Sequence, residues 1–334
     1  MSTSAQSTSA KSASARTPGP GHHSNKPAVF IDGEAGTTGL EIRERLARLP
    51  AFDVKSIDPE KRKDPTARQA LMKEVDLVVL CLPDDAAREA TALADDLGDA
   101  GPRIVDASTA HRVADGWTYG FPEMSREQEA RIRSSRRVAN PGCYPTGGIG
   151  LVRPLVDAGL MPADYPVTVN AVSGYSGGGK AMIEAYTSGN GPLFELYGLG
   201  LEHKHVPELQ HFSGLTRRPI FVPSVGNYLK DMLVSVPLHL DTLPGTPRVR
   251  DLEACLEAHY AGCNLVKVIS ADDPSSKGGR LDALALNDTD KLELRVFGSD
   301  KHRQAVLVAR LDNLGKGAAG AAVQNIGLML GVET

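Results

Sequence analysis

The sequence predicts an α/β fold in two parts: a doubly wound parallel sheet, followed by an α+β domain whose sheet is largely antiparallel. Short apolar runs alternate with helical patterns between residues 28 and 108, which indicates parallel strands joined by crossover helices. From residue 167 onward, longer strand patterns follow one another with one helix between them. The chain has 334 residues, more than a single core usually fills, so two domains are expected.

The first strand and the first helix enclose a glycine-rich turn. Ala28–Ile31 is a short apolar run typical of a buried strand, and apolar residues recur with helical spacing over residues 40–49. Gly33, Gly36 and Gly39 lie between them. The order strand, glycine turn, helix is the arrangement that opens a nucleotide-binding domain of Rossmann type.

The remaining elements follow from the same patterns. Further strands are predicted at 52–58, 76–83, 103–108 and 136–140, with helices at 64–75 and 84–98. After a helix at 146–160, the second half predicts strands Val167–Val172, Met232–Leu240, Leu292–Phe297 and Ala305–Leu311, a helix Arg250–Tyr260 and a final small-residue helix at 316–331. We therefore expect a first domain of residues 27–145 and 312–334, and a second domain of residues 146–311.

Composition restricts the class of protein. Apolar residues make up 41% and charged residues 23% of the chain, which is ordinary for a globular protein, and the net charge of −4 argues against a nucleic-acid partner. The apolar runs are too short to span a membrane. Four cysteines indicate reduced thiols and a cytoplasmic location. Residues 1–26, rich in Ser and Ala and without acids, predict a disordered tail and no secretory signal.

The glycine turn predicts a dinucleotide site made by Gly33, Gly36, Thr37, Thr38 and Gly39. Glycines let the backbone approach a pyrophosphate, and the start of the following helix presents free N–H groups and a partial positive charge. The alternative is a tight turn that holds no ligand.

Two features after the second strand give opposite indications of which nicotinamide dinucleotide binds. Asp58 lies 19 residues past Gly39, where an acid can hold the ribose of NAD. The basic triplet that follows, with Arg62 at its centre, suits the 2′-phosphate of NADP. A solvated run of charges is the third interpretation of the triplet.

Cys143 lies in the segment NPGCYPTG, between two prolines and at a predicted helix start. Gly142 permits unusual backbone angles, and Pro145 suits the first turn of a helix. A thiol at a helix N-terminus is expected to have a lowered pKa and to act as a nucleophile. The alternative is a small buried hydrophobic residue.

Two more segments carry polar groups. Ser173, Ser176, Gly177 and Lys180 lie in or next to the second glycine-rich loop GYSGGGK, which suits an anion but lacks the spacing of a nucleoside-triphosphatase loop. The segment HKHVPE holds His203, His205 and Glu208. In an extended segment the two histidines would lie on the same face and could form a metal pair, but a metal site is not predicted because no third ligand is evident. We favour a role for one histidine as the general acid–base group that exchanges a proton with the thiol.

Together the segments GEAGTTG, NPGCYPTG, SGYSGGGK, HKHVPE and DNLGKGAAGAAVQN resemble the N-acetyl-γ-glutamyl-phosphate reductase family, in its shorter type, among the aspartate-semialdehyde dehydrogenase-like enzymes. The resemblance runs from about Ala28 to the C-terminus. It implies that Cys143 is the nucleophile and that one of the two histidines is the acid–base group, with His205 preferred because Glu208 could orient it. It also implies that Asn313 lies near the nicotinamide of NADP, and that the final helix packs on the first domain.

The implied reaction is the reductive dephosphorylation of N-acetyl-glutamyl 5-phosphate to the semialdehyde, through a thioester on Cys143, in arginine biosynthesis. Arg112, Ser173 and Lys180 are the expected contacts of the anionic substrate, while Ser176 and Gly177 are expected to contact the cofactor. A homo-oligomer, either dimer or tetramer, is expected. Two alternatives stay open: another semialdehyde dehydrogenase acting on aspartate or amino-adipate semialdehyde, and an NADP-binding redox sensor without turnover.

Overall fold

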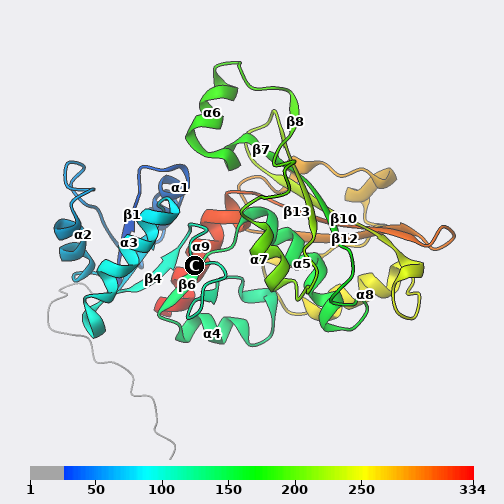
Figure 1. Cartoon of the computed structure of the whole chain (residues 1–334), viewed down its shortest axis with the longest axis horizontal. Coiled ribbons are helices and arrows are strands. Elements are labelled where there is room, and N and C mark those ends of the chain that lie inside the picture. The colour runs from blue at the N-terminus through cyan, green and yellow to red at the C-terminus, as the bar shows by residue number, and fades with distance from the viewer. Residues whose placement is uncertain (1–25) are drawn as a thin grey trace, which may run out of the picture.

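The computed structural model of the protein describes residues 26–334. Figure 1 shows two bodies side by side, the first built from blue and cyan segments joined by the red C-terminal helix, the second from green to orange segments. The predicted disordered tail, apart from Lys26, lies outside the described residues.

The first domain is built on a six-stranded sheet in the order β2-β1-β3-β4-β6-β5, and every pair of neighbouring strands is parallel. The strands are β1 (Ala28–Asp32), β2 (Asp53–Lys55), β3 (Leu77–Leu80), β4 (Arg103–Asp106), β5 (Thr118–Tyr119) and β6 (Arg137–Ala139). The predicted parallel sheet is confirmed, although β5 was not predicted and β2 is shorter than predicted. Residues 56–64 leave the sheet in a loop that is exposed except at Ile57.

Helices cover both faces of this sheet, which is why β1 and β3 are buried along their whole length. One face packs on α2 (Pro65–Met72) and α3 (Asp84–Asp95). The other face packs on α1 (Thr37–Ala47), α4 (Gln128–Ser134) and α9 (Gly320–Leu330). The prediction that the final helix packs back on the first domain is therefore confirmed, and its first turn is a short π-helical segment, η7 (Gly315–Ala319).

The second domain contains a seven-stranded sheet in the order β11-β12-β13-β10-β7-β9-β8. Its strands are β7 (Thr168–Gly174), β8 (Phe194–Leu196), β9 (Ile220–Gly226), β10 (Met232–His239), β11 (Val266–Val268), β12 (Leu292–Ser299) and β13 (Gln304–Leu311). Neighbours are antiparallel except for the pairs β7–β9 and β11–β12. The largely antiparallel sheet is confirmed, and the two parallel pairs make it mixed.

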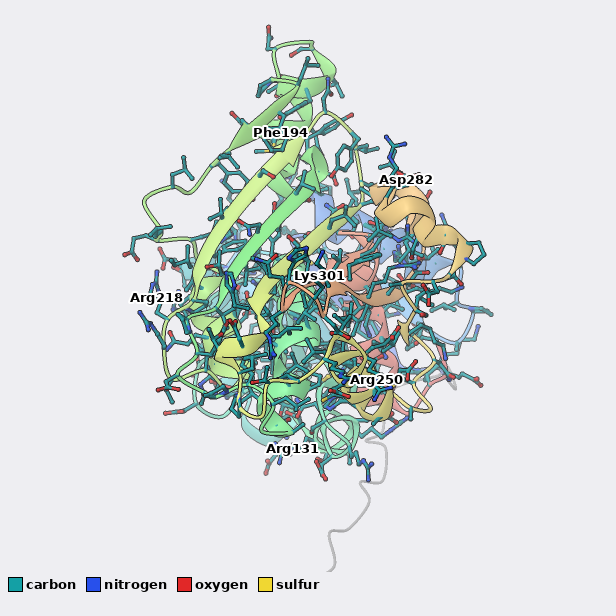
Figure 2. The ribbon with its side chains drawn as sticks, turned by 90° about the vertical axis from the view of Figure 1, so that its right-hand side faces the viewer. Arg131, Phe194, Arg218, Arg250, Asp282 and Lys301 are labelled. Carbon is teal, nitrogen blue, oxygen red and sulfur yellow. The ribbon has the colours of Figure 1, made fainter. Side chains whose placement is uncertain are left out.

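One face of the second sheet carries the main core. It packs on α5 (Cys143–Asp157), α7 (Val206–Phe212) and α8 (Val249–His259). A further helix, α6 (Gly179–Thr187), projects with β8 above the rest of the domain in Figure 1. Figure 2 views the molecule from the side of this domain, with Phe194 of β8 near one end and Lys301, in the turn between β12 and β13, near the centre.

Candidate active site

A cavity of about 370 Å³ lies where the two domains meet. It is lined from the first domain by the start of α1 and by the turn that precedes α5, and from the second domain by the ends of β7 and β9 and the start of α7. Most of the predicted site residues line it: Thr37, Thr38, Arg112, Cys143, Ser173, Ser176, Gly177, His203, His205 and Asn313. Segments separated by hundreds of residues are therefore brought to one place by the fold.

Cys143 is the first residue of α5, and Gly142 is the N-cap. The structure explains why glycine precedes the cysteine. A Cβ on Gly142 would lie 2.6 Å from Arg112 Nη1, 2.7 Å from Glu208 Oε1 and 2.9 Å from His205 Nε2. Such distances are too short for any side chain, so the glycine allows three functional groups to converge on the backbone next to Cys143.

The environment of Cys143 differs from the prediction of a lowered pKa. Burial raises the pKa of the thiol to about 11, although the Arg112 guanidinium and the first backbone N–H groups of α5 act in the opposite direction. The prediction from helix position alone was wrong, because it ignored the desolvation of the buried thiol. At neutral pH the thiol therefore keeps its proton, and a nearby base is needed to activate it.

The two histidines line the same cavity as the thiol and are neutral there. Burial lowers the pKa of His205 well below its usual value, and it lowers the pKa of His203 to about 4, so both rings carry an unprotonated nitrogen but are weaker bases than a free imidazole. Their segment is a turn rather than the predicted extended chain, because His205 has helical angles and is the N-cap of α7. The rings still meet, with centroids 4.7 Å apart, and His203 Nδ1 accepts the backbone N–H of His205 at 3.2 Å.

Glu208 does not bind His205, contrary to the prediction. Its carboxylate accepts hydrogen bonds from Arg112 Nη1 at 2.5 Å, from the Tyr119 hydroxyl at 2.9 Å and from the Gly142 backbone N–H at 3.1 Å. Arg112 also donates to the backbone carbonyl of Asn140 at 3.1 Å. Glu208 therefore fixes Arg112 and the turn in front of Cys143, and His205 Nδ1 is buried without a hydrogen-bond partner among the described residues.

The glycine turn has the shape that a pyrophosphate needs. Gly33 has φ of +90°, and a Cβ there would lie 2.3 Å from the carbonyl oxygen of Cys81. Helix α1 begins at Thr37 without a side-chain cap, so its first N–H groups remain available to a ligand. A second cavity of about 270 Å³ lies over this turn. These residues fit the pyrophosphate of a dinucleotide.

Lys180 lies on the nucleotide side of the site. It lines the second cavity together with Gly36 to Gly39 and does not line the cavity beside Cys143. Its predicted role as a substrate contact is therefore not supported by its position, since the cation faces the place expected for a cofactor phosphate. Tyr197 and Lys204 also line the cavity beside Cys143. Lys204 lies in the segment HKHVPE but was not expected to be a site residue, and no motif pointed to Tyr197.

Asn313 is buried and has a defined amide orientation. Its Oδ1 accepts the backbone N–H of Asp231 at 2.8 Å, and its Nδ2 donates to Ser176 Oγ at 2.9 Å. Asp231 has φ of +78°, a left-handed conformation that carries a strain cost for a residue other than glycine. The predicted pair Asn313 and Ser176 is thus brought together, whereas nothing in the sequence pointed to Asp231.

Arg62 and Asp58 stay away from both cavities. Arg62 is exposed in the turn that precedes α2 and makes no hydrogen bond or ion pair with any described residue. The carboxylate of Asp58 accepts the backbone N–H of Glu60 at 3.0 Å within its own turn. Within residues 26–334, no group of three or more His, Cys, Asp or Glu side chains is arranged to hold a metal ion.

Comparison with known proteins places the chain in a family. Residues 28–132 match the family description "Semialdehyde dehydrogenase, NAD binding domain", and residues 143–313 match "Semialdehyde dehydrogenase, dimerisation domain". The N-acetyl-gamma-glutamyl-phosphate reductases of Brucella ovis and Brucella canis are each 53% identical over 311 residues, covering 92% of this chain and 99% of theirs.

Solved structures agree on the fold. Aspartate semialdehyde dehydrogenase II of Vibrio cholerae superposes with a TM-score of 0.66 at 18% identity, covering 92% of this chain and 99% of that one. The enzyme of Francisella tularensis gives a TM-score of 0.70 at 13% identity, covering 91% and 100%. No helix among residues 26–334 is long and apolar enough to cross a membrane. The chain belongs to the N-acetyl-gamma-glutamyl-phosphate reductase family, a family of oxidoreductases within the semialdehyde dehydrogenases.

Proposed function

We propose that this protein catalyses the NADP-dependent reductive dephosphorylation of N-acetyl-glutamyl 5-phosphate to N-acetyl-glutamate 5-semialdehyde, the step that its relatives' name describes, in arginine biosynthesis. The observation that carries the proposal is the convergence of Cys143, His205 and Asn313 on one cavity, at the end of which α1 presents Thr37 and Thr38. A thiol, a neutral imidazole and a dinucleotide turn are the groups that acyl-phosphate reduction requires.

The steps follow from the protonation states. Neutral His205 accepts the proton of the Cys143 thiol, and the thiolate attacks the carbonyl carbon of the acyl phosphate. The C–O bond to phosphate breaks, the leaving inorganic phosphate takes a proton from solvent, and a thioester forms on Cys143. Reduced nicotinamide, when bound, supplies a hydride to the thioester carbonyl. The resulting thiohemiacetal anion on Cys143 then collapses to the aldehyde, and the departing thiolate takes its proton back from the His205 imidazolium.

The other polar groups support these steps without exchanging protons. Arg112 lies beside the thiol and favours its charged form, while Glu208 holds the guanidinium in place. Asn313 presents its amide to Ser176, and together they shape the wall that faces the nicotinamide. Lys180 contributes positive charge over the glycine turn.

A homodimer is the proposed assembly. The uncovered face of the second sheet is largely apolar and lines a hollow of about 640 Å³, formed among others by Val172, Phe194, Leu233, Phe297 and Val306. An exposed apolar surface of this kind is typical of a protein–protein interface, and the matched family description for this region is a dimerisation domain.

The four free cysteines support a reducing compartment such as the cytoplasm.

The test of the activity is phosphate-dependent reduction of NADP with N-acetyl-glutamate semialdehyde, compared with aspartate semialdehyde. The N-acetylated substrate should be preferred, and preference for aspartate semialdehyde would favour the related dehydrogenase instead. Cys143→Ser should lose nearly all turnover while it still binds NADPH, since a serine hydroxyl is scarcely ionised at neutral pH. Cys255→Ser, in α8, is the matched control and should keep its activity.

Mass spectrometry separates an enzyme from a redox sensor. Wild-type protein incubated with acyl phosphate in the absence of NADPH should carry an acyl adduct on Cys143. An adduct on another cysteine would contradict the mechanism, and NADPH binding without any adduct or turnover would support the redox sensor.

A further inference from the structure

Three polar side chains meet beside the glycine turn, and the mechanism gives them no role. Glu34 lies within the turn, Arg43 lies on α1 and Ser56 directly follows β2. Arg43 Nη1 donates to both Glu34 Oε2 and Ser56 Oγ, and Ser56 Oγ donates to the same Glu34 oxygen at 3.1 Å. The contacts form a closed triangle in which one carboxylate oxygen is held between a guanidinium and a hydroxyl.

The triangle lies where the adenosine end of a dinucleotide is expected. Strand β2 pairs with β1 in parallel, with Lys55 opposite Phe30, so Ser56 emerges at the carboxyl edge of the sheet next to the glycine turn. In doubly wound sheets a nucleotide whose pyrophosphate lies on the first turn brings its ribose to the end of the second strand. The Arg43 and Glu34 side chains are 43% and 26% exposed, so a ligand can reach them.

The chemistry of the three groups distinguishes two nucleotides. A guanidinium and a hydroxyl are good donors to a phosphate, which would accept hydrogen bonds where Glu34 Oε2 now accepts them. A carboxylate is the group that accepts a hydrogen bond from a free ribose 2′-hydroxyl. Glu34 therefore suits NAD and opposes NADP, while Arg43 suits NADP.

We propose that Glu34 weakens the binding of NADP relative to NAD, because it competes with a ribose 2′-phosphate for Arg43 and Ser56. The inference rests on the proposed nicotinamide nucleotide site but not on the chemistry at Cys143. Glu34 and Arg43, rather than Asp58 and Arg62, would then determine which of the two dinucleotides binds more tightly. Asp58 is engaged by the backbone of its own turn.

Direct binding tests the proposal without turnover. NADPH and NADH are titrated into the full-length protein, and the fluorescence of the bound nicotinamide is followed. Glu34→Gln should bind NADPH about tenfold more tightly than the wild type and NADH no more tightly, because a negative charge close to the 2′-phosphate is removed. Arg43→Gln should bind NADPH about tenfold more weakly and NADH within about twofold. Raising the salt concentration should reduce both effects on NADPH.

Arg48→Gln is the matched control, because Arg48 is an exposed arginine at the opposite end of α1. Its affinities for both nucleotides should equal those of the wild type. If Glu34→Gln and Arg43→Gln change the two affinities by the same factor, the triangle only shapes the glycine turn and the proposal is overturned. If the wild type binds neither nucleotide, the proposed cofactor itself is wrong, which is a different result. Should Arg43→Gln fail to fold, Glu34→Gln alone decides, since it preserves the shape of the side chain.

Discussion

Replacing Glu208 by alanine should unfold the protein at a markedly lower temperature. The Glu208 side chain is 1% exposed and that of its partner Arg112 is 8% exposed, so the substitution leaves a buried guanidinium without a counter-charge. Removing one partner of such a pair costs about 3–5 kcal/mol of unfolding free energy. With roughly 2–4 °C per kcal/mol for a domain of roughly 150–250 residues, the size range of the domain that holds Glu208, the melting temperature should fall by roughly 6–20 °C.

Thermal unfolding monitored by circular dichroism provides the measurement, and two milder variants provide the comparison. Tyr119→Phe removes one of the three hydrogen bonds to the carboxylate and should cost about 1 kcal/mol. Glu208→Gln removes the charge but keeps the shape, so its loss should be intermediate. It should also lower the pKa of the Cys143 thiol, since the negative charge of Glu208 contributes to raising that pKa. Iodoacetamide should then alkylate Cys143 faster at pH 8.

A Glu208→Ala protein that melts like the wild type but has lost its turnover would contradict this role of Glu208. That result would mean that Glu208 orients His205, as predicted from the sequence, and does not serve to fix Arg112 and the Cys143 turn.

Four further substitutions test other parts of the structure. Burial, and second the negative charge of Asp312, raises the pKa of Asp231 to about 7. Between about pH 4 and 7 the folded protein therefore keeps a proton that the unfolded chain has released, and the free energy of unfolding falls as the pH rises through this range. Asp231→Asn should flatten this dependence in urea unfolding at pH 5 and pH 8; an unchanged slope would contradict the assignment. Gly33→Ala should weaken NADPH binding and lower the melting temperature, because its Cβ would collide with the Cys81 carbonyl; wild-type affinity in titrations would show that the turn can widen. His205→Asn should reduce kcat about 10²–10⁴-fold and His203→Asn much less; the reverse order in steady-state kinetics would make His203 the base.

The elements that could be predicted are those whose signal is local. Strand β1, the glycine turn and α1 follow from the apolar run at Ala28–Ile31 and from the spacing of Gly33, Gly36 and Gly39. The position of Cys143 at a helix start follows from its proline and glycine neighbours. Periodicity and turn-forming residues are properties of neighbouring positions in the chain, so they can be recognised without knowing the fold.

What could not be predicted depends on residues far apart in the chain. Glu208 binds Arg112, which lies 96 positions earlier, and no pattern near either residue indicates the pair. The raised pKa of Cys143 results from burial between two domains, so a local rule about helix ends gave the wrong direction. The parallel pairing of β7 with β9 likewise depends on the intervening α6, β8 and α7, which lack strong periodicity.

The return of the chain's last segment to the first domain has a consequence for folding during protein synthesis. Helix α9 covers the same sheet face as α1 and α4, and its Ala322 and Ile326 belong to that core. The ribosome therefore synthesises the whole second domain before α9 can cover its part of the nucleotide-binding sheet. Until then the sheet face that includes Val29 and Ile31 is covered only by α1 and α4, and the apolar surface left bare favours association with other nascent chains. A premature stop codon shortly before α9 should accordingly yield insoluble protein rather than an enzyme of reduced activity.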